Sequence, residues 1–133
     1  MNRNTANHFS ILSEEDKTMQ IRLIVLRTEN LQRLVAFYSL FGLKFDFHKH
    51  GNSPFHFSAA IENVTLEIYP LAKGQVEPDK NLRIGFTLDH FEATMDILKN
   101  EAVEFKEPVQ TEFGFMSIVS DPDGRKIELY RKE

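Results

Sequence analysis

The apolar residues of this 133-residue chain follow two periods, and these periods alternate in an order that occurs twice. A β-rich apolar segment comes first, a segment with apolar residues at helical spacing follows, and three further β-rich segments complete each series. The first series occupies residues 20–71, a polar connector with Gly74 and Pro78 occupies residues 72–81, and the second series occupies residues 82–131. The sequence therefore predicts an α+β fold of two β-α-β-β-β modules, here called module one and module two.

The turns and helix starts of module one are the clearest. Asn30 is placed to cap a helix that begins at Leu31, and Gly42 provides the residue at which that helix ends. Glu62-Asn63 is predicted to be a two-residue turn between two strands. With that turn, Ser58 pairs with Glu67, and His56 pairs with Tyr69.

Module two shows the same order of elements with different capping and turn residues. Asp89 and Glu92 have the spacing of a capping box at the start of its helix. Residues 103–105 and residues 113–120 are predicted to be strands. Asp121-Pro122-Asp123-Gly124 is a strong turn signal before a last strand that closes the chain.

Composition excludes several classes of function. The net charge of -4 argues against a surface that binds nucleic acid or an anionic membrane, because such surfaces need a basic patch. The absence of Cys excludes disulfide scaffolds and thiol nucleophiles, and it favours a cytoplasmic location. No segment is apolar enough over its length to span a membrane. Residues 1–19 are expected to form a polar N-terminal arm before a single domain over residues 20–133.

Two separated motifs carry a resemblance to a known superfamily. The series Asn30-Leu31, Ala36-Phe37-Tyr38 and Phe41-Gly42-Leu43 resembles the first module of the vicinal oxygen chelate superfamily, which includes glyoxalase I, bleomycin-resistance proteins and extradiol dioxygenases. The ending from Asp121 to Leu129 resembles the superfamily's signature. The resemblance implies paired modules that form a cupped mixed sheet with helices outside, a site inside the cup, and frequent completion across a homodimer.

Metal-dependent members of that superfamily place one ligand on the first strand and one on the last strand of each module. The resemblance carries these positions to Leu23, Glu67, Arg83 and Glu128. Leu23 offers no lone pair, and Arg83 is a permanent cation without an acceptor. At an effective dielectric of about 20, a guanidinium about 4 Å from a divalent ion costs on the order of 8 kcal/mol, whereas pairing it with a carboxylate gains about 4 kcal/mol. We therefore expect Arg83 to replace a metal's charge.

Strand alternation predicts which side chains line the cup. It places His56 and Ser58 on the same face as Glu67 and Tyr69. Tyr130 and Phe115 are candidates for an aromatic wall, and core filling is the alternative for Phe115. The predicted ligand-binding pocket consists of Glu67, Arg83, Glu128, His56, Tyr69, Leu23, Ser58, Tyr130 and Phe115. The alternatives are that both Glu residues simply face solvent and that Arg83 extends past the strand edge.

A metal-dependent alternative depends on one histidine. His56, Glu67 and Glu128 with waters form a donor set for Mn, Fe, Ni or Zn. His48 and His50 adjoin a glycine turn and are expected to face solvent. Such a metal would favour a lyase, an isomerase or a dioxygenase.

The sequence thus predicts a homodimeric protein that binds a small organic molecule without a metal cofactor. Amine-bearing or neutral polar ligands are favoured, because two carboxylates and one guanidinium leave a formal charge of -1 in the pocket. The rival functions are the metal-dependent enzyme and a non-catalytic regulatory or interaction module.

Overall fold

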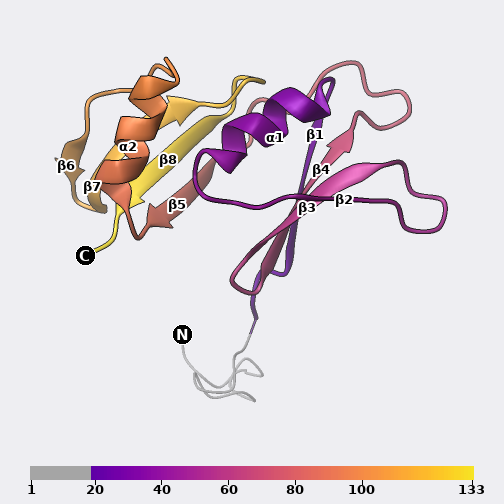
Figure 1. Ribbon diagram of the computed structural model, residues 1–133, viewed down its shortest axis with the longest axis horizontal. Helices are drawn as coiled ribbons and strands as arrows, with labels where there is room; N and C mark the ends of the chain where they lie inside the picture. Colours follow the sequence, from indigo (N-terminus) through magenta and orange to yellow (C-terminus); the bar gives the residue numbers. More distant parts are fainter. Residues whose placement is uncertain (1–18) are drawn as a thin grey trace, which may run out of the picture.

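Module one, in the computed structural model of residues 19–133, is one helix and a mixed four-stranded sheet (Figure 1). Apart from Met19, the expected N-terminal arm lies outside the described residues. The strand order is β1-β4-β3-β2, with β1 parallel to β4 and the other pairs antiparallel. The elements are β1 (Leu23–Thr28), α1 (Leu31–Ser39), β2 (Asp46–His48), β3 (His56–Ile61) and β4 (Val64–Pro70).

Module two repeats this arrangement. Its strand order is β5-β8-β7-β6, again with one parallel pair, between β5 and β8. The elements are β5 (Ile84–Leu88), α2 (Phe91–Asn100), β6 (Val109–Thr111), β7 (Gly114–Ser120) and β8 (Lys126–Arg131). The predicted α+β class and the two β-α-β-β-β modules are confirmed.

The two modules are equivalent down to the register of their parallel strands. Glu67 pairs with Val25 in module one, and Glu128 pairs with Gly85 in module two. These pairs are related by shifts of 60 residues on the first strand and 61 on the last. The two carboxylates therefore occupy the same place in their respective sheets.

The two helix starts differ from each other. The Asn30 side chain caps α1 as predicted, because its oxygen accepts a 3.0 Å hydrogen bond from the Arg33 backbone N–H. The capping box predicted at Asp89 is wrong. His90 is the N-cap residue of α2 and makes no side-chain cap bond, and Asp89 instead lies 3.5 Å from Lys132 Nζ.

The strand predicted over residues 103–105 is also wrong. Only Phe105 bridges to β7, opposite Val119, and the second strand of module two in chain order is β6. β6 pairs with the start of β7 across a short turn, with Thr111 opposite Gly114. A local hairpin of this kind closes at a small entropic cost, which explains why β6 forms next to β7.

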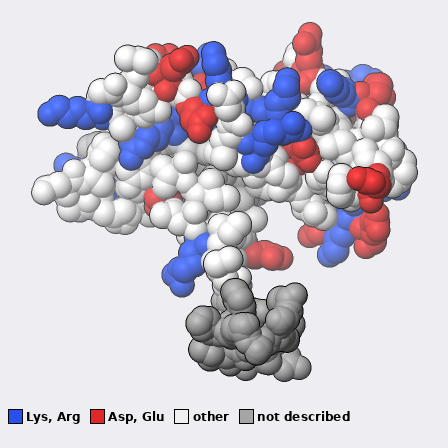
Figure 2. Space-filling view, turned by 180° about the vertical axis from the view of Figure 1, so that it is seen from behind, with Lys and Arg blue, Asp and Glu red and all other residues white. Residues whose placement is uncertain are grey.

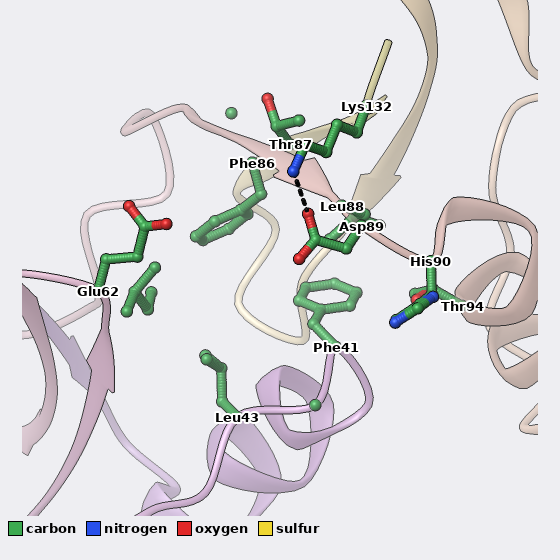
Figure 3. A pocket seen from close by; sticks show the side chains of 13 residues that line it. Phe41, Leu43, Glu62, Phe86, Thr87, Leu88, Asp89, His90, Thr94 and Lys132 are labelled. Carbon is green, nitrogen blue, oxygen red and sulfur yellow. Dashed lines mark ion pairs between the residues drawn. The ribbon is translucent and has the colours of Figure 1, made fainter.

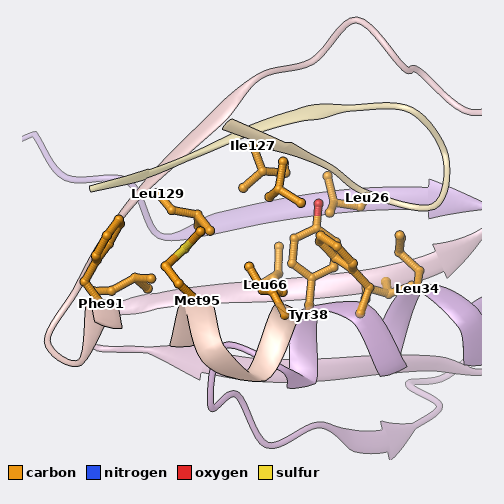
Figure 4. Close-up of a cluster of buried hydrophobic side chains, with 13 residues drawn as sticks. Leu26, Leu34, Tyr38, Leu66, Phe91, Met95, Ile127 and Leu129 are labelled. Carbon is orange, nitrogen blue, oxygen red and sulfur yellow. The ribbon is translucent and has the colours of Figure 1, made fainter. Parts of the chain in front are cut away.

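The helix-facing sides of both sheets contribute to one core. α1 packs on β3 and β4, while α2 packs on β8. Figure 4 shows side chains of α1, α2, β1, β4 and β8 meeting in this cluster. Its most buried members are Leu26, Leu34, Phe37, Tyr38, Leu66, Ile68, Leu88, Phe91, Met95, Leu98, Val119, Ile127 and Leu129. Each fully buried aliphatic side chain contributes about 1.5–3 kcal/mol.

A buried polar cluster crosses between the modules beside this core. Arg125, from the turn before β8, donates to Asp121 Oδ2 at 3.1 Å and to Asp123 Oδ2 at 3.0 Å. It also donates to the Arg27 carbonyl, at the end of β1, at 2.8 Å. Tyr38 of α1 donates to Asp121 Oδ2 at 2.7 Å. The turn from Asp121 to Gly124 therefore anchors module two onto module one.

The sheet faces opposite the helices remain open. Leu23 and Val25 on β1 are 53% and 37% exposed, and Phe113 before β7 is 76% exposed. The two sheets are not hydrogen-bonded to each other, so each presents half of a cup. On the face seen in Figure 2, Lys and Arg side chains are interspersed with Asp and Glu, and an area with few charges lies over module one. Within residues 19–133, no helix is long and apolar enough to cross a membrane.

Candidate functional site

The open face of module one carries five of the predicted pocket residues. On β3 and β4, Ser58 pairs with Glu67, and the neighbouring ring of His56 stacks on Tyr69 with centroids 4.2 Å apart. This is the hairpin register that the Glu62-Asn63 turn predicts. Leu23 lies on β1 two residues before the partner of Glu67. The residues of this face are Leu23, Val25, Arg27, Asp46, His48, His56, Ser58, Ala60, Thr65, Glu67 and Tyr69.

His56 has the most unusual surroundings on this face. The side chain is fully buried, and its Nδ1 lies 3.0 Å from the Pro54 carbonyl oxygen. Its Nε2 lies 3.7 Å from Glu67 Oε2. Among residues 19–133, Nε2 has no hydrogen-bond partner. An unpaired buried polar atom is costly, and its presence on an open sheet face points to something that binds there.

The open face of module two carries three linked polar side chains. Arg83, just before β5, donates from Nη2 to Glu128 Oε2. Tyr130, two residues further along β8, donates to Glu128 Oε1 at 2.7 Å. This hydrogen bond to the carboxylate raises the pKa of the Tyr130 hydroxyl. Both oxygens of Glu128 are thus engaged by neighbouring donors.

The predicted aromatic wall divides between two faces. Tyr130 lies on the open face and, with Thr87 and Phe113, lines a cavity of about 330 Å³. Phe115, predicted for the pocket, instead lies on the helix side, where its ring packs against Phe91 at 5.7 Å. The alternation of β7 explains this placement, because Phe115 and Val119 share a strand face and Val119 belongs to the core.

The metal-ligand set predicted for the alternative function comes together only in part. His56 and Glu67 are adjacent, whereas Glu128 is held by Arg83 and Tyr130 in the other module. The third side chain beside His56 and Glu67 is His50, and the ligating atoms of these three lie within 4.8 Å of one another. Sequence reasoning missed His50, which is exposed as expected but lies near the start of the loop between β2 and β3, with its ring 5.1 Å from that of His56.

A further cavity lies between the modules and is lined in part by Gly85 and Thr87 of β5 (Figure 3). Its volume is about 680 Å³, within the range of small-molecule sites. Phe41 and Phe86 line its apolar part with ring centroids 6.0 Å apart, and the Asp89–Lys132 ion pair lies beside them. Within residues 19–133, neither Glu67 nor Glu128 lines any of the cavities of about 680, 330 and 250 Å³. Two of its charged groups, Asp89 and Lys132, already pair with each other, so the open faces are the better candidates.

Several solved structures have the same fold. An antibiotic-binding protein from Streptomyces sp. CB03234, TnmS3, has a TM-score of 0.73 and 20% identity, and the likeness covers 88% of this chain and 98% of that one. Lactoylglutathione lyase from Agrobacterium tumefaciens has a TM-score of 0.66 and 14% identity over 86% and 95% of the two chains. The oxidase ChaP-H2 has a TM-score of 0.69 and 13% identity over 87% and 95%.

A search of curated proteins finds no match. The family model described as Glyoxalase/Bleomycin resistance protein/Dioxygenase superfamily matches residues 20–129. That span begins just before β1 and ends within β8, so it includes both modules. Together with the paired modules and the two carboxylates at equivalent places, this match shows that the chain belongs to the Glyoxalase/Bleomycin resistance protein/Dioxygenase superfamily.

Proposed function

We propose that residues 20–133 form a single domain that binds a small organic molecule on the open sheet faces, without a metal held jointly by the superfamily's usual ligand positions in the two modules. The observation that carries this proposal is the Arg83–Glu128 ion pair. Arg83 stands at one of those positions, and its guanidinium is paired with the carboxylate of Glu128, which stands at another. Leu23, at a third position, has no atom that binds a metal.

The chemistry of the open faces favours a particular class of ligand. Glu67 and Glu128 carry two negative charges and Arg83 carries one positive charge, which leaves a formal charge of -1. Tyr130 presents an aromatic ring beside Glu128, whereas the ring of Tyr69 is already stacked on His56. Flat ligands that bear an amine, or neutral polar aromatic ligands, match this combination of charge and ring surface.

The proposal includes a homodimer, because one chain leaves each half of the cup open. β1 and β5 each form one edge of their sheets, opposite the edges formed by β2 and β6, and have a strand partner on one side only among residues 19–133. The exposed Leu23 and Val25 lie on β1 itself. An apolar edge of this kind is a site of strand pairing or sheet packing with another chain. A second copy, whose module two faces module one of the first, would cover both half-cups.

Binding can be tested with a panel of flat aromatic amines and neutral aromatic amides. Each compound is titrated by calorimetry into wild type and into the Glu67→Gln and Glu128→Gln variants. We expect at least one amine to bind wild type and to bind both variants about tenfold or more weakly, since charge-assisted contacts contribute about 1.5–3 kcal/mol. Glu104→Gln, at an exposed residue outside both faces, is the matched control and should leave affinity unchanged.

Two results would contradict the proposal. Binding that is equal in all variants would place the ligand elsewhere, for example in the cavity between the modules. Metal-dependent turnover of a hemithioacetal or a catechol that is lost in Glu128→Gln would establish the enzyme alternative instead.

A further inference from the structure

We propose that module one holds a divalent transition metal of the Zn²⁺ type through His50, His56 and Glu67. This site goes beyond the proposed function, because it lies in one module and does not involve Arg83 or Glu128. It shares only Glu67 with the superfamily's usual ligand positions. Its donors come from β3, β4 and the loop between β2 and β3.

The distances match a four-coordinate ion closely. Zn–N and Zn–O bonds of about 2.0–2.1 Å at tetrahedral angles place neighbouring ligand atoms about 3.3 Å apart. His56 Nε2 and Glu67 Oε2 already lie 3.7 Å apart. All three donor atoms lie within 4.8 Å of one another, and His50 is exposed on a loop. Binding therefore needs those ligand atoms to approach one another by up to about 1.5 Å, which the exposed side chain of His50 is the freest to supply.

The hydrogen bond of His56 to the backbone selects a tautomer that suits ligation. A carbonyl oxygen can only accept, so the 3.0 Å contact with Pro54 requires a proton on Nδ1. In the neutral imidazole, Nε2 then carries the lone pair, toward Glu67 and without a hydrogen-bond partner among residues 19–133. A ring nitrogen that donates to a backbone carbonyl while the other faces the ion is the usual arrangement of metal-binding histidines. A metal removes the cost of that buried, unpaired nitrogen.

Neighbouring rings hold His56 in this orientation. Its ring stacks on Tyr69 at 4.2 Å, with an interplanar angle of 12°. The rings of His48 and His50 lie 5.7 and 5.1 Å from it. Arg27 lies over the Tyr69 ring and donates to the Pro70 carbonyl. It comes from β1, which borders β4 on the side opposite to β3. The donor set is therefore preorganised at His56 and adjustable at the exposed His50.

Two imidazoles and one carboxylate select the kind of metal. This donor set suits Zn²⁺, Co²⁺ or Ni²⁺, whereas Mg²⁺ and Ca²⁺ prefer oxygen ligands only. Three protein ligands leave a fourth position for water or for a donor atom of a molecule in the cup, as in open zinc sites. The metal would thus be exchangeable.

The test uses the full chain, free of any affinity tag and treated with a chelator, and the probe is Co²⁺ alone. Titration should give one equivalent per chain, with the visible d–d absorption of cobalt bound to nitrogen ligands. His50→Ala and Glu67→Gln should each weaken binding about tenfold or more. His50 is exposed, so its replacement keeps the fold even if variants of the buried His56 fail to fold.

Two matched variants serve as controls. His90→Ala removes an exposed histidine outside the cluster, and Glu128→Gln removes the equivalent carboxylate of module two. Both should bind Co²⁺ as wild type does. The absence of saturable binding, or equal affinity in His50→Ala and wild type, would overturn the proposal. Loss of binding in Glu128→Gln would also overturn it. The titration contains Co²⁺ and no organic ligand, so neither outcome tests the proposed function, which is tested by the calorimetry described above.

Discussion

The hydroxyl of Tyr38 donates a 2.7 Å hydrogen bond to Asp121 Oδ2 and thereby joins the helix of module one to the last turn of module two. Both residues are buried, and Asp121 also accepts from Arg125. Tyr38→Phe should lower the free energy of unfolding by about 1.5–3 kcal/mol, the value of a hydrogen bond to a charged group. Urea unfolding measures the change. Tyr130→Phe, which removes a hydroxyl from an open face, should cost less.

The same tyrosine predicts a loss of stability at alkaline pH. Burial, followed by the charge of Asp121, raises the pKa of Tyr38 far above its ordinary value. Above pH 10 the unfolded chain releases this proton and the folded chain keeps it, so stability is complete below pH 10 and falls as the pH rises. The slope is about 1.4 kcal/mol per pH unit for one group. Urea unfolding at several pH values should show this slope in wild type, and Tyr38→Phe should lack it.

The sequence predicted the elements that local chemistry specifies. Asn30 capped its helix, and the Glu62-Asn63 turn fixed the register that pairs Ser58 with Glu67. Both depend on contacts between residues close in the chain. The resemblance placed Glu67 and Glu128 at equivalent positions, and the strand pairing agrees. The apolar neighbours of each carboxylate face the core, so the carboxylate itself faces the other side of the sheet.

What could not be predicted depends on distant contacts. Asp89 has a capping sequence, but Lys132 at the end of the chain lies beside it instead. Phe115 alternates with Met116, and only the position of α2 decides which of them faces the core. His50 comes near Glu67 because a loop folds back, and no periodicity reports the path of such a loop.

Two glycines should respond differently to the same substitution. Gly124 has φ +96° in the turn that anchors module two, a conformation that disfavours any residue with a Cβ. Gly85 has no such dihedral, and a Cβ there would lie 3.6 Å from Tyr130, an ordinary contact. Gly124→Ala should therefore cost about 1–2 kcal/mol, while Gly85→Ala changes stability by less. Thermal unfolding of the two variants side by side decides this, and equal losses would contradict it.

The proposed homodimer can be tested by the mass of the protein in solution. Light scattering should give twice the mass of one chain for wild type. Leu23→Arg places a charge on the exposed edge strand β1, and it should give the mass of one chain because burying an unpaired charge is costly. Ile97→Arg, on the exposed side of α2, is the control and should stay dimeric. A single-chain mass for wild type at all concentrations would contradict the dimer.

The location of the core has a consequence for how this protein diversifies. The side chains that hold the modules together lie on the helix side of each sheet, and the candidate ligand-binding groups lie on the other side. Strand alternation places these two sets on neighbouring residues without mutual contact, as with Leu66, Glu67 and Ile68. Substitutions at Glu67 or Arg83 can therefore alter selectivity at little thermodynamic cost. Such a scaffold allows its recognition surface to drift quickly under selection while its architecture is inherited unchanged.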